Sequence, residues 1–339
     1  MRYFLHRQVF QNAWRCNKNE INNSQTEIKQ SANKIAVCYV YKNRKGLTKN
    51  FGQKQALKGL DMTVPVGAIY GFIGENGSGK STTEKLICGL LVPSGGTIKL
   101  LGKDYTDADV RAKVGVLIEA PGCFPNLSVW NNMMLQAANL NISNPEKEVR
   151  EVLRMVRMEG AAGNKYKNCS LGMKQRIGIA MALLGHPTLL VLDEPINGLD
   201  ADGMRIMREI LLDITRNGQC TVLISSHILG ELEKIATHYG IVRGGKMIKE
   251  MTAQELDAGC RTYVALQTRE MNRAKALLSC RYSRVEEDES GYLRVYDAGG
   301  PEEIVTYLYE NGILVGEIKT DKIGLEEYYI DLMKEKEGR

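Results

Sequence analysis

Residues 74–82 read Gly-Glu-Asn-Gly-Ser-Gly-Lys-Ser-Thr, a spacing that is suited to holding a polyphosphate. Glycine allows backbone N–H groups to approach an anion closely and to adopt positive φ. Lysine and serine then follow in the order glycine, four residues, glycine, lysine, serine or threonine, which is the P-loop pattern. A glycine-rich turn that matches by accident is the alternative. The residues expected to contact a nucleotide are Gly74, Glu75, Asn76, Gly77, Ser78, Gly79, Lys80, Ser81 and Thr82.

The sequence on either side of this loop supplies the elements that such a site needs. The apolar run Ala68–Ile73 predicts a buried strand that enters the loop, and residues 80–90 predict the helix that leaves it. The N-terminus of a helix favours an anion through its free N–H groups and its dipole. We therefore expect a nucleoside triphosphate, with Lys80 on its β- and γ-phosphates and the Ser81 hydroxyl on Mg²⁺. Glu75 is expected to point to solvent, because a carboxylate beside phosphate is repelled.

Two acids follow a second apolar run. Thr188–Leu192 predicts a buried strand, and Asp193 and Glu194 stand at its carboxyl end. Asp193 is the expected acidic partner of Mg²⁺. Successive side chains of a strand point to opposite faces, so Glu194 is placed to act as a general base on water. Taken alone, Asp-Glu-Pro is equally well explained as an acidic turn that closes a strand.

Further motifs decide between these interpretations. Residues 169–176 read Cys-Ser-Leu-Gly-Met-Lys-Gln-Arg, residues 197–200 read Asn-Gly-Leu-Asp, and the apolar run Cys220–Ile224 is followed by Ser-Ser-His. In this order, over roughly residues 45–250, the sequence resembles the nucleotide-binding subunit of an ATP-binding cassette (ABC) transporter. It is most similar to the ATPases of bacitracin- and lantibiotic-type peptide exporters. Those share Ser-Leu-Gly-Met-Lys-Gln and Leu-Ile-Glu-Ala-Pro, which stands here at Leu117–Pro121.

The resemblance implies a role for each matching residue. Phe51 would stack on adenine, although a lone aromatic residue is also commonly part of a core. Ser170 and Gly172 would close over the γ-phosphate of the opposite subunit, and Asp200 would lie in the loop that joins the two sites. His227 would contact the γ-phosphate; the alternative is a polar cap on the helix that follows.

The sequence also departs from the family pattern. Leu171 and Met173 stand where glycine and glutamine are usual, so the packing beside Ser170 is expected to differ. Glu119 replaces the usual glutamine that senses the membrane subunit. A carboxylate still binds Mg²⁺ but cannot donate a hydrogen bond as an amide does. The implied metal ligands are therefore Ser81, Asp193 and Glu119.

The resemblance further implies a mechanism. Two copies would pair head to tail around two ATP–Mg²⁺, with Glu194, His227 and Lys80 as the catalytic residues. Closure and opening would be transmitted to a separate membrane permease, from the cytoplasmic face of the membrane, to export a peptide antibiotic or drug-like molecule. The alternative is a non-transport ABC ATPase that acts on the ribosome or DNA. Such proteins carry two cassettes or long insertions, which this sequence lacks, so no nucleic acid partner is expected.

Bulk properties are consistent with this assignment. The 339 residues, 43% hydrophobic and 25% charged, suit a globular protein of two domains. No apolar run approaches the roughly 18 residues that span a bilayer, and no secretory signal is expected. The eight cysteines are scattered without Cys-x-x-Cys pairs, which is typical of reduced thiols in cytoplasm.

The predicted fold class is α/β with a small α+β domain at the C-terminus. Residues 1–36, within a basic stretch that gives residues 1–50 a charge of +8, are expected to be a disordered extension. Residues 37–250 would form the cassette: antiparallel strands at 37–47 and 57–64, a RecA-like core, and helices between 128 and 158. Residues 251–339 would form an accessory domain with the order βαββαβ over 262–319 and a terminal helix at 325–337.

Overall fold

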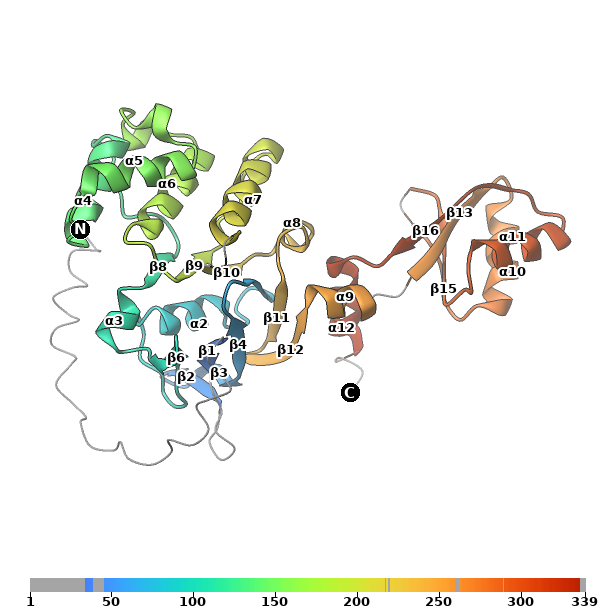
Figure 1. The fold of residues 1–339 in the computed structure, drawn as a ribbon. Coiled ribbons are helices and arrows are strands. Elements are labelled where there is room, and N and C mark those ends of the chain that lie inside the picture. The colour runs from blue at the N-terminus through green and yellow to red at the C-terminus, as the bar shows by residue number, and fades with distance from the viewer. Residues whose placement is uncertain are drawn as a thin grey trace. The chain divides into compact units, whose positions relative to one another are not determined.

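The computed structural model describes residues 34–38 and 46–335, apart from 217, 219, 260, 261 and 289. The expected disordered extension therefore lies mostly outside the described residues. The chain divides into two compact units between Met251 and Thr252. Each unit contains a sheet of its own (Figure 1).

A six-stranded sheet forms the centre of the first unit, in the order β12-β11-β5-β10-β9-β8. Its neighbours β11, β5, β10, β9 and β8 pair in parallel. These strands are apolar along nearly their whole length because both faces of a parallel sheet are covered. Their bounds are Ile69–Ile73 for β5, Val114–Leu117 for β8, Leu189–Asp193 for β9, Thr221–Ser225 for β10, His238–Arg243 for β11 and Lys246–Thr252 for β12.

The parallel pairing of the strands determines where the polar residues of the candidate site lie. The P-loop follows β5, Glu119 follows β8, Glu194 follows β9 and His227 follows β10. Because the carboxyl ends of parallel strands meet at one edge of the sheet, all four segments leave the sheet at the same edge. Residues more than 100 positions apart in the sequence are brought together in this way.

Helices cover the sheet and build a separate group at one side, where α4, α5 and α6 lie together (Figure 1). The stripe Val149, Val152, Leu153 and Val156 is buried there, as its helical spacing predicts. The Ser128 hydroxyl caps α4 by accepting a hydrogen bond from the Asn131 N–H. The helices are α2 Lys80–Ile87, α3 Ala108–Arg111, α4 Val129–Asn139, α5 Pro145–Met155, α6 Leu171–Leu183, α7 Ala201–Thr215 and α8 Leu229–Glu233, with 3₁₀ turns at Glu159–Ala161 and Tyr166–Asn168.

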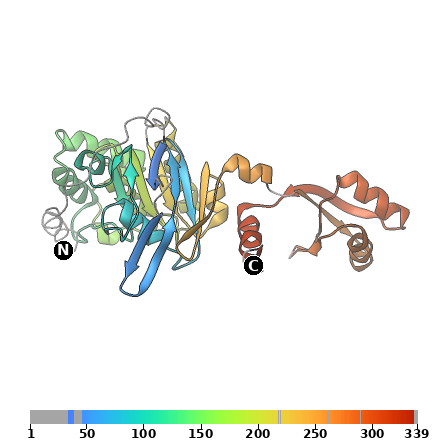
Figure 2. The ribbon, with the colours of Figure 1, turned by 90° about the horizontal axis from the view of Figure 1, so that it is seen from below.

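The antiparallel part differs from the sequence prediction. The predicted strand 57–64 is two strands, β3 (Lys54–Leu60) and β4 (Met62–Pro65), and each pairs with a different partner: β3 with β2 (Leu47–Phe51) and β4 with β1 (Lys34–Cys38). The positive φ of Gly59, at +88°, turns the chain just before the break. The β2–β3 hairpin is blue in Figure 2. A further short pair joins β6 (Lys99–Leu100) to β7 (Lys103–Asp104).

The second unit contains a four-stranded antiparallel sheet in the order β14-β15-β13-β16. The βαββαβ order is as predicted, and a preceding helix, α9, was not anticipated. Alternate residues of β13 face α10 and α11 on one side, while Tyr263 and Ala265 face the other. The bounds are α9 Ala253–Gly259, β13 Thr262–Thr268, α10 Met271–Arg281, β14 Val285–Glu287, β15 Leu293–Tyr296, α11 Pro301–Glu310, β16 Val315–Lys322 and α12 Leu325–Glu335.

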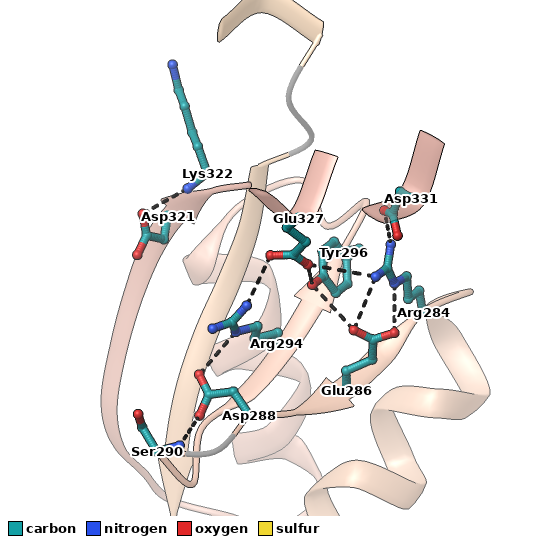
Figure 3. Close-up of polar contacts among 10 residues, drawn as sticks. All are labelled: Arg284, Glu286, Asp288, Ser290, Arg294, Tyr296, Asp321, Lys322, Glu327 and Asp331. Carbon is teal, nitrogen blue, oxygen red and sulfur yellow. Dashed lines mark hydrogen bonds and ion pairs between the residues drawn. The ribbon is translucent and has the colours of Figure 1, made fainter. Parts of the chain in front are cut away.

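A charged network joins α12 to the face of this sheet that α10 and α11 leave open (Figure 3). The Arg284 guanidinium donates to Asp331 at 2.9 Å, and that of Arg294 donates to Glu327 at 3.2 Å. The Tyr296 hydroxyl donates to the other Glu327 oxygen at 2.7 Å. Glu327 is therefore the member of α12 that is held by both the sheet arginine and the tyrosine.

Among the described helices of both units, none has the length and apolar character needed to cross a bilayer.

Candidate active site

The P-loop connects a fully buried strand to a helix without intervening structure. Strand β5 ends at Ile73 and α2 begins at Lys80. Gly77 and Gly79 have φ of +80° and +113°, which a residue with a side chain would adopt only with strain. The Lys80 ammonium folds back over the loop and donates to the carbonyl oxygen of Gly74 at 2.6 Å. The loop is thus already curved around the lysine that is expected to bind phosphate.

The loop has the features that a phosphate group requires. A Cβ at Gly74 would lie 2.4 Å from the Val242 carbonyl oxygen, so only glycine fits where the chain is closely packed. The space around a Cβ at Gly77 is open, on the side where N–H groups can meet a ligand. The Ser78 hydroxyl is buried and has no hydrogen-bond partner among the described residues. Glu75 is exposed, as expected. A triphosphate therefore fits the residues present.

Asp193 is held in place by the neighbouring strand. It is the last residue of β9, and the Ser225 hydroxyl at the end of β10 donates to its Oδ1 at 2.9 Å. The Glu194 N–H donates to the same hydroxyl oxygen at 3.2 Å and to the Ser225 carbonyl oxygen at 3.2 Å. Ser225, which the sequence analysis did not single out, therefore ties the two acids to the sheet.

Glu194 and His227 form a hydrogen-bonded pair. Glu194 Oε2 lies 2.5 Å from His227 Nδ1, and the side chains are 24% and 52% exposed. Glu194 has a φ of +50°, an unfavourable conformation for a residue with a side chain, which turns its carboxylate away from the strand direction. A carboxylate that is oriented by an imidazole and reaches water can accept a proton from that water.

Glu119 makes a contact that the sequence did not predict. Its backbone also has positive φ, at +66°, and its carboxylate forms an ion pair with Lys85 of α2 at 3.0 Å. Its side chain is 75% exposed, so this pair contributes little stability. The carboxylate is free to exchange Lys85 for another cation.

Ser170 and Asp200 both stand at helix N-termini. The Ser170 hydroxyl accepts from the Met173 N–H at 3.3 Å, and the Asp200 carboxylate accepts from the Gly203 N–H at 2.8 Å. These bonds use acceptor capacity only, so the Ser170 O–H can still donate to an anion. In the described part of the chain, neither Ser170 nor Gly172 is hydrogen-bonded to the P-loop.

Comparisons with known proteins agree with this geometry. The ABC transporter family model matches residues 57–197. The bacitracin transport ATP-binding protein BcrA of Bacillus licheniformis is 35% identical over 292 residues, which cover 85% of this chain and 95% of that protein. This chain belongs to the ABC transporter family. It is an ATP-binding protein of that family and an ATPase.

A further relative and a solved structure are also similar to this ABC ATPase. The lantibiotic transport ATP-binding protein SrtF of Streptococcus pyogenes is 40% identical over 204 residues, which cover 60% of this chain and 87% of that protein. The structure of cbiO1 from Clostridium perfringens, part of the ABC transporter complex cbiONQ, matches with a TM-score of 0.60 and 26% identity. It covers 67% of this chain and 92% of cbiO1.

Phe51 of the ABC ATPase lies at the end of β2 with 46% of its surface exposed. The Lys49 ammonium lies 5.1 Å from the centre of its ring. An exposed ring beside a cation is suited to stack on a base, and the adenine contact stays a prediction.

One acid near the site was missed by the sequence analysis. Glu84 of α2 is fully buried. Burial raises the pKa of its carboxyl group well above the usual range, and the negative charge of Asp193 acts in the same direction. The signal was available: a glutamate stands four residues after Lys80 and three residues before the apolar Ile87, and both spacings place it on one face of the helix.

Proposed function

We propose that this ABC ATPase energises export of a peptide antibiotic, or of a similar drug-like molecule, through a separate membrane permease. The observation that carries the proposal is the likeness to BcrA over 95% of that protein's length, and the gathering of the residues proposed for hydrolysis at one sheet edge supports it. The proposed class of cargo is taken from the names of these relatives, which are bacitracin and lantibiotic transport ATP-binding proteins. The proposal of export rather than uptake rests on the signature sequence at residues 170–175, which resembles that of the peptide exporter ATPases.

The working unit that we propose is a homodimer of this chain at the cytoplasmic face of the membrane. The P-loop of one copy would face Ser170 and Gly172 of the other, with ATP between them and Asp200 beside the boundary. The exposed position of Leu171, at 50%, and the free O–H of Ser170 support a partner at this helix end. Because ATP would touch both copies, its binding energy favours the closed dimer, and loss of the γ-phosphate favours opening.

The chemistry follows from the positions of the side chains. Glu194 would orient water and accept its proton, while His227, which is hydrogen-bonded to the Glu194 carboxylate, would lie beside the γ-phosphate. Lys80 would move from the Gly74 carbonyl oxygen to the β- and γ-phosphates and stabilise charge there. Ser81 and Asp193, with Glu119 from the adjacent loop, would hold Mg²⁺. The metal ion, when bound, neutralises negative charge on the phosphate oxygens.

Transmission to the permease would pass through the segment after β8. Glu119 lies in that segment, and it is tied to α2 by an exposed ion pair that a ligand can break. A change at the phosphates would then shift Glu119, and with it the loop that continues to α4. No nucleic acid partner is part of this proposal.

The test is affinity purification of the tagged chain from detergent-solubilised membranes of its own host, followed by mass spectrometry. We expect a multi-span membrane protein in stoichiometric amount. Ribosomal proteins or DNA without such a partner would contradict the transport proposal and favour the non-transport ABC ATPases. A parallel purification of the untagged chain controls for proteins that bind the resin.

A further inference from the structure

The sheet of the C-terminal unit has one long edge that no described strand covers. Strand β16 stands at the end of the order β14-β15-β13-β16 and is eight residues long, whereas β14 at the opposite edge has three residues. No backbone hydrogen bond joins residues 317–321 to any described element other than β13. All of these residues except Ile318 are exposed. Such an edge presents backbone donors and acceptors with which a further strand can pair.

One flank of α11 adds apolar surface beside this edge. Ile304 and Leu308 are buried, and Tyr307 points toward α10, to which its hydroxyl donates a hydrogen bond. Val305 and Tyr309, four residues apart, therefore lie on the flank that faces away from α10. Helix α11 packs on β16, whereas α10 packs on the other three strands. The flank with Val305 and Tyr309 is thus the one toward the β16 edge.

Exposed apolar side chains are concentrated at this place. In the described part of the C-terminal unit, four large apolar side chains are exposed: Val305, Tyr309, Leu314 and Ile330. Three of the four belong to α11 or directly precede β16, and Tyr309 and Leu314 are 69% and 74% exposed. Apolar side chains that gather beside a free strand edge mark a contact surface.

The charges of β16 indicate which partner fits. Glu317 and Lys319 share one face of the strand: the Tyr292 hydroxyl donates to Glu317 at 2.8 Å, and the Lys319 ammonium lies 4.9 Å from the centre of the Tyr292 ring. Ile318 stands between them and packs on the core beneath α10 and α11. When two β16 strands pair antiparallel about a two-fold axis at Ile318, each Glu317 stands opposite the Lys319 of the other copy. The strand is therefore complementary to itself.

Other registers of this pairing are less favourable. Moving the axis by one residue places Glu317 opposite Glu317, or Lys319 opposite Lys319, and like charges directly opposite each other are destabilising. An axis at Thr320 joins opposite charges again, but it places Ile318 opposite Lys322. With the axis at Ile318, two isoleucines meet on the face of the sheet that carries α11.

We propose that β16 is a site at which two copies of this chain pair: the two strands join their sheets in the register centred on Ile318, and the apolar flanks of the two α11 helices meet beside them. The contact contains neither nucleotide nor permease, so it goes beyond the ATP-bridged dimer proposed above. Two copies joined at β16 stay together when ATP is absent. The effective concentration of each P-loop for the signature of the other copy is then higher than in free solution.

The test measures the dimer dissociation constant of the full-length chain by sedimentation equilibrium, without nucleotide and in EDTA. We expect the unsubstituted chain to dimerise. Glu317→Lys or Lys319→Glu alone places two like-charge pairs in the contact, so each should weaken the dimer about tenfold or more. The double variant exchanges the charges and should return the dissociation constant to near that of the wild type. Glu310→Lys makes the same charge change on the side of α11 that Arg281 shares, and is the matched control.

Disulfide trapping tests the register. In the pairing centred on Ile318, the two Ile318 Cα atoms lie about 5 Å apart, a separation that a disulfide spans. The background is Cys280→Ser, because Cys280 is an exposed free cysteine. With oxidised glutathione, Ile318→Cys should join two copies covalently, whereas Thr320→Cys, on the same face of the strand, should not. The background chain without a new cysteine controls for its remaining thiols.

Four results would overturn the proposal. They are a nucleotide-free chain that stays monomeric up to about 100 μM, single charge variants that dimerise as the wild type does, a double variant that does not recover, and cross-linking of Thr320→Cys in place of Ile318→Cys. Neither measurement involves ATP turnover or a membrane protein. Absence of a permease in the purification above would leave both results unchanged, so the two proposals fail separately.

Discussion

At the scale of single residues, the Glu194 carboxylate is the group that we propose as the base in hydrolysis. It is hydrogen-bonded to His227 and partly open to water, and the Glu194 N–H donates to Ser225 at the end of β10. We expect Glu194→Gln to bind ATP as well as the wild type does and to lose turnover by about 10²- to 10⁴-fold, because an amide cannot accept the proton. Phosphate release and equilibrium binding of labelled ATP measure the two effects. Turnover at the wild-type rate would remove Glu194 from the role of base.

Some residues of the candidate site can be predicted from sequence motifs, and others cannot. The positions of Lys80, Asp193, Glu194 and His227 at one edge of the sheet could be predicted because each lies at or after the end of an apolar strand, and their roles stay predictions. Ser225 could not be assigned in this way. Its contact with Asp193 depends on which side chains meet across β9 and β10, and a single sequence does not state that contact.

At the scale of elements, strands with uniform apolar character were predictable, and strands with irregular pairing were not. Residues 262–268 were predicted as the strand that the structure contains. The segment 57–64 is continuous in composition, but Gly59 and Asp61 divide it between two partners, which is a tertiary effect. Helix α9 was missed because seven residues carry too little periodicity to be distinguished from a loop.

The attachment of α12 to its sheet gives a prediction at this scale. Glu327 accepts from Arg294 and Tyr296 and lies near Arg284 (Figure 3). Glu327→Gln should loosen α12 by about 1 kcal/mol, seen as about fivefold faster amide exchange in residues 325–335. Glu326→Gln, an exposed neighbour on the same helix, is the matched control. Equal exchange in both variants would mean that the network does not hold the helix.

At the scale of the whole molecule, the described chain contains one P-loop and one signature segment, and the two are not hydrogen-bonded to each other. In the proposed homodimer, a second copy supplies the missing half of each site. Two compact units also separate the ATPase from the C-terminal βαββαβ unit, whose sequence carries none of the nucleotide-binding motifs. Composition and motif order predicted this division, but not what the C-terminal unit binds.

The most direct test of a site shared between two copies is to mix two inactive variants. Lys80→Ala disables the P-loop, and Gly172→Asp places a negative charge at the signature, where the position of a Cβ has only ordinary contact with Leu199 at 3.6 Å. Each variant alone should be inactive. In a mixed dimer, one site combines the intact P-loop of one copy with the intact signature of the other. An equal mixture should therefore recover about a quarter of the wild-type ATPase rate if sites act independently. No recovery, with mixed dimers demonstrated by differently tagged copies, would contradict a site shared between two chains.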